Sequence, residues 1–394
     1  MASEWTTVRA ADFIEFNPRL SIKKGAMATK VAMDKLQPFT KKIPATEQAE
    51  FAGGSKFCNG DTIMARITPC LENGKTAFVD ILADGEVAFG STEFIVMRAR
   101  AGISDPQFVY YLATSPAFRN VAIKSMDGSS GRQRVQQGVL DELELTVPPL
   151  KEQQKIGAIL AMMDQKIALN NKINDNLQQQ AYAYFLQLFI ENADPSWRVG
   201  KIADLGTVVG GGTPSKAKPE YYTDDGIAWI TPKDLSIDKS KFIAHGENDI
   251  SELGYRNSSA TMMPVGTVLF SSRAPIGYIA IASNEVTTNQ GFKSVVPHPE
   301  IGTPFVYYFL IHDLPLIESK ASGSTFKEVS GSVMKSVEAV IPDGNTIAKF
   351  NDFCRPVFEM QEKLEQENRK LAAMRDSLLP RLMSGEIDVA DIGI

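Results

Sequence analysis

The chain has 394 residues, of which 43% are hydrophobic and 22% are charged, a composition typical of a soluble globular protein and not of a disordered one. Its length predicts two to three domains. The 41 basic and 47 acidic residues give a net charge of −6, which argues against unselective binding to a polyanion, so any nucleic-acid site must be a local basic face.

Residues 1–148 consist of short apolar stretches separated by Gly, Pro and Asn. Three of these stretches, Asp61–Ile67, Lys75–Asp80 and Glu93–Arg98, have the residue pattern of strands. The segment Pro106–Thr114 predicts a short helix. This region is therefore predicted to form a twisted, mostly antiparallel sheet with loops and one short helix.

A long amphipathic segment follows at residues 149–192. When it is written in heptads, most seam positions are apolar, starting with Ile156 and Leu160, and Asn170 and Asn174 interrupt the seam. A helix of this length extends about 60 Å, since each residue adds ~1.5 Å. It is much longer than a tether between two domains has to be, so we predict a stiff spacer.

Residues 195–342 have the same pattern of short apolar stretches as residues 1–148. Strand-like stretches occur here at Gly266–Ser271, Gly277–Ala282 and Lys293–Val296. A second amphipathic segment then occupies residues 343–386. The chain thus has the predicted order of domain, helix, domain and helix.

The two long segments belong to an internal repeat, because residues 135–189 and 329–383 align without a gap. A repeat of this size predicts two copies of one unit, related by pseudo-twofold symmetry. Asn174 and Asn368 occupy the same seam position in the two copies, where a buried Asn fixes helix register. We predict that the helices pack antiparallel with these two Asn close together. The alternative is that each helix covers only its own globular domain.

Two prolines interrupt the second helical segment. Pro356 is expected either to begin the helix or to kink it, and Pro380 predicts a break or bend near its end. The second helix is therefore expected to be shorter or less straight than the first.

No catalytic motif is present. The run Val209–Lys216 has glycines but lacks the spacing of a Walker loop, and it fits a flexible turn at least as well as a phosphate-binding loop. His245, His298 and His312 have no Cys or carboxylate at metal-ligand spacing. There is no nucleophile elbow and no Asp/Asn-Pro-Pro-Tyr/Phe stretch of an amino-methyltransferase. We predict neither catalytic residues nor a metal site.

The N-terminal residues show no signal peptide, and no stretch approaches the ~18 apolar residues of a membrane span. The three cysteines Cys58, Cys70 and Cys354 are odd in number and scattered, which fits reduced thiols. These features predict a cytoplasmic protein without a membrane partner.

Polar loops with guanidinium, amide and hydroxyl groups recur at matching places in both halves. Arg, Lys, Asn and Gln contact base edges in the major groove, and Ser and Thr suit phosphates. The candidate DNA-contacting residues are Arg66, Thr68, Asn73, Lys75, Ser129, Arg132, Gln133 and Arg134 in the first half, and Ser271, Ser272, Arg273, Asn289, Gln290, Lys293, Ser324 and Lys327 in the second.

Several longer motifs are more specific when taken together. They are Ala65–Ala77, Gly90–Phe94, Val147–Gln153, Thr288–Phe292, Gly323–Lys327 and Leu378–Glu386. With these motifs the chain resembles, over essentially its whole length, the specificity subunits of type I restriction–modification enzymes.

The resemblance implies an α+β fold with two β-rich target-recognition domains, residues 1–148 and 195–342, related by pseudo-twofold symmetry. They are separated by two long antiparallel coiled-coil helices, residues 149–192 and 343–386. Each domain would read one half of a split double-stranded DNA site, and the helices would set the unread gap.

The resemblance also implies partners. Two modification subunits would bind along the coiled coil and methylate adenine N6 with S-adenosylmethionine. Two restriction subunits would use ATP and Mg for cleavage, and this chain itself would hold no cofactor. The opening Pro342–Ile347 departs from Pro148–Gln153 of the first copy, so partner contacts are expected to differ there.

Two other functions remain open from the sequence. The net acidity favours a coiled-coil scaffold without a nucleic-acid role. The other is an enzyme in its own right, a methyltransferase or nuclease. Substitution of Arg132 and Arg273 by Ala would distinguish a DNA reader from a scaffold, since a scaffold should not respond.

Overall fold

The computed structural model describes residues 5–129, 131–323 and 327–389. The chain forms two compact units: unit 1 contains residues 1–168 and 368–394, and unit 2 contains residues 169–367. Each unit therefore holds one globular domain and a part of both long helices. The predicted repeat of one domain and one helix is not a self-contained folding unit, because each helix is shared between the two units.

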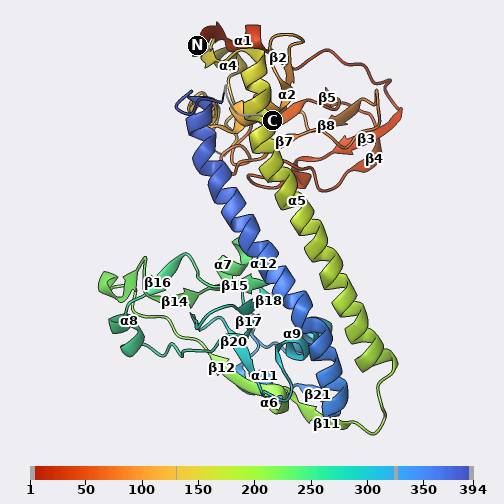
Figure 1. Ribbon diagram of the computed structural model, residues 1–394, viewed down its shortest axis with the longest axis vertical. Coiled ribbons are helices and arrows are strands. Elements are labelled where there is room, and N and C mark those ends of the chain that lie inside the picture. The colour runs from red at the N-terminus through yellow and green to blue at the C-terminus, as the bar shows by residue number, and fades with distance from the viewer. Residues whose placement is uncertain (1–4, 130, 324–326, 390–394) are drawn as a thin grey trace. The chain divides into compact units, whose positions relative to one another are not determined.

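The globular part of unit 1 consists of short strands followed by three helices and a final strand (Figure 1). Its elements are β1 (Thr6–Arg9), α1 (Ala10–Phe13), β2 (Ile14–Phe16), β3 (Met27–Val31), η1 (Met33–Lys35), β4 (Glu47–Glu50), β5 (Ser55–Phe57), β6 (Thr62–Ala65), β7 (Thr76–Phe78), β8 (Ala88–Gly90), β9 (Phe94–Ala99), α2 (Pro106–Thr114), α3 (Pro116–Lys124), α4 (Gln137–Asp141) and β10 (Glu144–Val147).

Unit 1 contains three sheets among its described residues. One has the order β2-β9-β6-β7 and is antiparallel throughout, and the second has the order β4-β3-β8-β5 with one parallel pair, β3 with β8. The third pairs β1 with β10 and brings the two ends of the domain together. The prediction of a mostly antiparallel sheet is confirmed for this unit.

Helix α2 begins where the sequence predicts it. The Asp105 carboxylate accepts a hydrogen bond from the Phe108 amide at 2.9 Å, and Pro106 occupies the first turn, where its missing donor costs nothing. All residues from Phe108 to Ala113 are buried. The helix thus fills the core of unit 1 together with Ile156 of the central helix and Leu379 of the last helix.

Unit 2 repeats this plan with additional short elements. They are β11 (Arg198–Lys201), α6 (Ile202–Leu205), β12 (Gly206–Gly210), η3 (Pro219–Tyr221), β13 (Tyr222–Thr223), β14 (Ile227–Ile230), α7 (Pro232–Ile237), β15 (Phe242–Ile243), β16 (Asn248–Ile250), α8 (Glu252–Arg256), β17 (Val268–Ser272), β18 (Ile276–Ala282), β19 (Thr287–Thr288), β20 (Lys293–Pro297), α9 (Thr303–His312), α10 (Leu314–Ser319), α11 (Gly331–Ser336) and β21 (Glu338–Ile341).

The described residues of unit 2, like those of unit 1, form two larger sheets and one two-stranded sheet. A five-stranded sheet has the order β12-β20-β17-β18-β15, a four-stranded sheet has the order β13-β16-β14-β19, and β11 pairs with β21. Helix α9, the counterpart of α2, is buried from Phe305 to Leu310. Its aromatic rings pack against Phe185 and Phe350 of the two long helices, so the helices are part of this core as well.

The long helices are α5 (Leu150–Leu186), continued by the π-helical turn η2 (Gln187–Glu191), and α12 (Gly344–Met383). Within unit 1, early α5 contacts late α12 through an ion pair between Asp164 and Arg375. Within unit 2, late α5 contacts early α12, with Tyr184 against Phe350. The helices are therefore antiparallel in both units, and the alternative that each helix covers only its own globular domain is wrong.

The polar seam positions of α5 in unit 2 have hydrogen-bond partners on α12. In unit 2 the fully buried Asn170 amide donates to Glu367 at 2.8 Å, and the Gln361 amide donates to the Asn174 carbonyl at 3.2 Å. Asn174 lies in unit 2 and Asn368 in unit 1. Their predicted proximity therefore stays a prediction.

Neither proline ends the second helix, and whether it is less straight than the first stays a prediction. α12 has 40 residues and runs through Pro356 and Pro380, whereas α5 has 37 and continues through the five residues of η2. Proline removes one backbone donor and crowds the carbonyl four residues earlier. Both prolines lie on exposed parts of the helix surface, as does Asp352, so water can bind the carbonyl that Pro356 releases.

The two helices begin differently, as their sequences indicate. At the start of α5 the buried Gln153 amide donates to the carbonyls of Pro148 and Ile103 at 2.9 and 3.1 Å. At α12 the Asp343 carboxylate accepts from the amides of Asn345 and Thr346, both at 3.0 Å, which is a side-chain N-cap. In the described part of the chain, neither helix is apolar enough along its length to cross a bilayer.

Candidate nucleic-acid interface

Two predicted polar loops of unit 1 lie side by side. The Thr68 amide donates to the Gln133 carbonyl, and the Gln133 amide donates to the Thr68 hydroxyl, both at 3.0 Å. The Val135 amide donates to the Arg66 carbonyl at 2.8 Å. We call residues 66–75 and 127–135 without 130 together the first loop pair. The backbone joins segments that are far apart in sequence into one polar surface.

The side chains of the first loop pair fall into two groups. Asn73, Ser129 and Arg132 are exposed and available to a ligand. Arg66 and Lys75 instead donate to backbone carbonyls of the unit, at 3.1 and 3.0 Å. The second group therefore holds the loops in place in this conformation, although its members were predicted as contacts.

Arg134 has a carboxylate partner at the surface of this loop pair. Its Nε donates to Glu93 Oε2 at 2.9 Å and its Nη2 donates to Glu93 Oε1 at 2.6 Å. The Arg134 side chain is 46% exposed and the Glu93 side chain is 23% exposed. The hydrogen bonds from Arg134 lower the pKa of Glu93 below its ordinary value. The pair is therefore ionised at neutral pH.

Unit 2 has the same two-loop arrangement, which we call the second loop pair, residues 271–277 and 322–329 without 324–326. The Val329 amide donates to the Ser272 carbonyl at 3.0 Å, as Val135 does to Arg66. The Glu328 carboxylate lies 3.5 Å from both Arg273 and Lys293. In both loop pairs, a carboxylate meets a cationic side chain at the polar surface.

An open cavity of about 480 Å³ borders the second loop pair. Arg273, Asn289 and Gln290, three of the predicted contact residues, line it together. Lys216 also lines it, at the end of the run Val209–Lys216 that was weighed as a phosphate-binding loop. Lys233 lines it as well, and only its proximity in the folded unit identifies it, since it comes from a segment outside the predicted loops.

Glycines allow the walls of this cavity to approach one another. A Cβ atom on Gly211 would lie 2.1 Å from the Asn289 carbonyl oxygen and 2.3 Å from that of Thr288, closer than real Cβ contacts. The Gly212 amide donates to the Thr288 carbonyl at 2.8 Å, and Trp229 Nε1 donates to the Gly212 carbonyl at 2.9 Å. The glycine-rich run is therefore a tightly packed wall, which corrects its interpretation as a flexible turn.

Some predicted residues of unit 2 are not accessible. Ser271 and Ser272 are fully buried, and their hydroxyls donate to the carbonyls of Pro275 and Gly291 at 2.8 and 3.0 Å. In this conformation the two hydroxyls satisfy the chain itself, and a DNA contact from Ser271 or Ser272 stays a prediction. Lys327 is exposed, and Ser324 lies outside the described residues.

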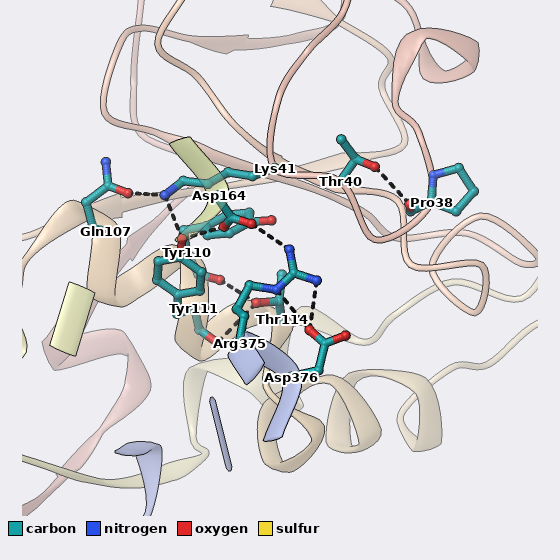
Figure 2. Close-up of polar contacts among 10 residues, drawn as sticks. All are labelled: Pro38, Thr40, Lys41, Gln107, Tyr110, Tyr111, Thr114, Asp164, Arg375 and Asp376. Atoms are coloured by element: carbon teal, nitrogen blue, oxygen red, sulfur yellow. Dashed lines mark hydrogen bonds and ion pairs between the residues drawn. The ribbon is translucent and has the colours of Figure 1, made fainter. Parts of the chain in front are cut away.

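A buried cluster attaches the domain of unit 1 to its helices (Figure 2). Lys41 donates to Gln107 and, at 3.0 Å, to the Tyr111 hydroxyl, and its ammonium group lies 4.5 Å from the centre of the Tyr111 ring. The Tyr111 hydroxyl donates to Asp164 at 2.5 Å, and Arg375 donates to the other oxygen of Asp164 at 2.5 Å. One chain of hydrogen bonds thus joins the domain, α5 and α12.

Unit 2 has a corresponding cluster without the ion pair. The Lys241 ammonium donates to Gln361 at 2.8 Å and to the Tyr308 hydroxyl at 3.3 Å, and the Tyr308 hydroxyl donates to Gln178 at 3.0 Å. The ammonium lies 3.7 Å from the centre of the Phe358 ring. Burial lowers the pKa of Lys241 to about 7 and that of Lys41 to about 8.

The depressed pKa of Lys241 predicts a stability that depends on pH. Unfolded lysine titrates near 10.5, so between pH 7 and that value the unfolded chain binds a proton that the folded chain has lost. Stability should therefore rise from pH 7 to pH 9, by up to about 1 kcal/mol per pH unit from this group. Urea unfolding of a Lys241→Met variant should show this rise reduced. Lys239→Met, at an exposed neighbour, should keep it; equal slopes in all three proteins would contradict the assignment.

Among the described residues, no three His, Cys, Asp or Glu side chains are gathered as metal ligands. The arrangement that the two units do share is a pair of polar loops on a rigid, helix-anchored domain. Guanidinium, amide and ammonium groups at such a surface suit recognition of base edges and phosphates.

Comparison with known proteins agrees with this geometry. Residues 2–179 and 195–367 match the family described as type I restriction modification DNA specificity domain. The chain belongs to this family. Each matched range covers one of the two domains and more than half of the helical segment that follows it, and together they cover most of the sequence.

Individual members of the specificity family are similar over different extents. The MjaIX specificity subunit of Methanocaldococcus jannaschii is 37% identical over 193 residues, which cover 48% of this chain and 44% of that subunit. The match therefore spans less than half the length of that relative. The HindI specificity subunit of Haemophilus influenzae is 26% identical, with 83% of this chain and 86% of that subunit covered.

A crystal structure supports the fold. The S subunit of a type I restriction–modification system from M. genitalium superimposes with a TM-score of 0.59 at 15% identity, with 96% of each chain covered. At this identity the likeness concerns the fold alone. It confirms the predicted α+β fold of two β-rich domains and two long helices.

Proposed function

We propose that this chain is the specificity subunit of a type I restriction–modification enzyme. Each unit reads one half of a split double-stranded DNA site. The observation that supports this most is the recurrence of one two-loop arrangement in both units, with Arg132 exposed in the first loop pair and Arg273, Asn289 and Gln290 around one cavity in unit 2.

In this proposal the chain itself does no chemistry. Two modification subunits bind along α5 and α12 and methylate adenine N6 with S-adenosylmethionine, and two restriction subunits use ATP and Mg. Exposed apolar side chains on the long helices, among them Met162, Leu169 and Met360, support a partner on these surfaces. The paired helices set the unread gap between the half-sites.

The division of labour follows from physical requirements. Phosphate contacts give salt-dependent affinity, and base contacts give selectivity. An adenine must leave the base stack before it is methylated, so the duplex has to be held while the partner acts. Two rigid readers on a pair of helices can hold the duplex in this way.

Binding of the subunit assembly to its target duplex should depend on Arg132 and Arg273. Arg132→Ala should weaken binding to all sequences and lower the slope of log affinity against log salt by about one, because an exposed guanidinium acts as a phosphate contact. Arg273→Ala should lower selectivity at a base pair of the half-site read by unit 2. The measurement is a titration of labelled duplex at several salt concentrations with the full chain and its modification subunits.

Arg198→Ala, which removes an exposed guanidinium on β11 paired with Asp204, is the control and should leave DNA binding unchanged. If the assembly binds every duplex equally, or if neither loop variant changes binding, the chain is a scaffold and not a DNA reader.

A further inference from the structure

We propose that Arg134 reads a guanine in the half-site of unit 1 and that Glu93 positions it. The inference rests on the proposed function, because it names one base contact within the same site. It assigns different roles to two arginines of one loop, Arg134 as a base reader and Arg132 as a phosphate contact.

The geometry of the ion pair leaves one edge of the guanidinium available. Glu93 accepts hydrogen bonds from Nε and Nη2 of Arg134. These two nitrogens form the edge of the guanidinium that is closer to the backbone. The other edge, formed by Nη1 and the second hydrogen of Nη2, has no acceptor among the residues that the structure describes. That edge carries two parallel donors.

Two parallel donors match guanine. Its major-groove edge presents the acceptors O6 and N7, and a bidentate Arg contact to them is the commonest specific contact in protein–DNA complexes. The other bases do not offer two adjacent acceptors on this edge, because adenine has a donor at N6. An Arg side chain whose Nε–Nη2 edge is held by a carboxylate and whose Nη1–Nη2 edge is free can therefore select guanine.

The carboxylate also decides between a base contact and a phosphate contact. Glu93 neutralises Arg134, and the ion pair is only partly exposed, so Arg134 contributes little net charge to attract a phosphate. Instead, Glu93 removes rotamer freedom of a long side chain before DNA binds, which lowers the entropic cost of a directed hydrogen bond. Arg132, exposed and without a carboxylate partner among the described residues, keeps its full charge.

The backbone around Arg134 is fixed on both sides. Its amide donates to the Asp127 carbonyl at 2.8 Å and its carbonyl accepts from the Asp127 amide at 3.0 Å. The next residues on either side, Gln133 and Val135, bond to Thr68 and Arg66 of the neighbouring loop. Hydrogen bonds thus fix both the backbone and the guanidinium group of Arg134. A specificity-determining residue needs this preorganisation.

The same place in unit 2 carries the opposite charge. The residue before Val329 is Glu328, and its carboxylate lies 3.5 Å from Arg273 and Lys293, whereas the residue before Val135 is Arg134. The position before this valine therefore carries a cationic side chain in unit 1 and an anionic side chain in unit 2. The guanine assignment applies to unit 1 alone, and the two half-sites are expected to differ at this contact.

The test measures binding of the full chain with its modification subunits to a set of duplexes. In this set, each base pair of the wild-type target is replaced in turn by the other three. Arg134→Ala should lower discrimination at one G·C pair of the half-site of unit 1 by at least about tenfold and leave the other positions unchanged. Glu93→Gln should reduce discrimination at the same pair by a smaller factor, and its salt dependence should be steeper than that of the wild type, because Arg134 loses its counter-charge.

Arg132→Ala in the same loop is the matched control, and it should weaken all duplexes equally and flatten the salt dependence. If Arg134→Ala does this as well, Arg134 is a phosphate contact and the inference is wrong. It is also wrong if neither Arg134→Ala nor Glu93→Gln changes any preference, since the pair is then only structural. A wild-type assembly without any base preference would instead contradict the proposed function itself.

Discussion

Asp164→Ala should destabilise unit 1 by about 3 kcal/mol, because it removes the buried counter-charge of the Arg375 guanidinium and leaves only the exposed Asp376 carboxylate, at 2.8 Å, as its partner. Only 10% of the Asp164 and 17% of the Arg375 side chain are exposed, and the 2.5 Å contact between them is supported by the Tyr111 hydroxyl on the other carboxylate oxygen. Burial acts to lower the pKa of Arg375, but the carboxylates of Asp164 and Asp376 together outweigh it and raise that pKa.

Amide hydrogen exchange can report this loss separately for each unit. Protection of the α2 amides, Pro106–Thr114, should fall by roughly two orders of magnitude in Asp164→Ala, whereas the α9 amides, Thr303–His312, should keep their protection. Asp12→Ala, which breaks an ion pair with Arg9 at the protein surface, is the control and should have little effect.

A double variant separates the lost charge from the lost packing. Asp164→Leu combined with Arg375→Met removes both charges and keeps apolar volume, so it should recover most of the protection lost in Asp164→Ala. Unchanged α2 protection in the single variant would show that the ion pair does not hold the helices to the domain of unit 1.

Gly211→Ala should abolish most of the selectivity for the half-site read by unit 2. The new methyl carbon would lie 2.1 Å from the Asn289 carbonyl oxygen, so either the glycine wall or the Asn289–Gln290 turn must move. Such overpacking costs about 1–3 kcal/mol. Because Asn289, Gln290 and Arg273 line the same cavity, the displacement should reduce discrimination by at least about tenfold.

Gly210→Ala is a close control, because a Cβ on Gly210 meets nothing within 4 Å. This variant should bind both half-sites as the wild type does, and Gly211→Ala should retain its preference at the half-site of unit 1. The measurement is the same set of base-substituted duplexes. Equal behaviour of the two glycine variants would contradict the role of the glycine wall.

The fold was predictable where local signals determine it. The Asp105–Pro106 pair begins α2 at the predicted residue, and the heptad seam predicted two antiparallel helices. The length of α12 was not predictable from its prolines, because their effect depends on whether the helix surface around Pro356 is exposed. The sharing of each helix between two units was not predictable either, because it depends on which residues of the helix meet which core.

The candidate site was predictable only as a set of loops. The sequence selected Arg273, Asn289 and Gln290, which do line one cavity, but Arg66 and Lys75 donate to backbone carbonyls that no local pattern reveals. Lys233 was missed because it reaches the cavity from another segment. Likewise the partner of Arg134, Glu93, is distant in sequence, and the ion pair changes what that arginine can do.

The most direct test of the account is a map of methylated adenines in the genome of a host that carries this chain with its modification subunits. We expect one motif with two specified parts separated by a gap of constant length. Exchange of residues 195–342 for those of a relative should change one part and leave both the other part and the gap as they were. Methylation at unrelated sequences, or at a single continuous motif, would contradict a chain that reads DNA with two units.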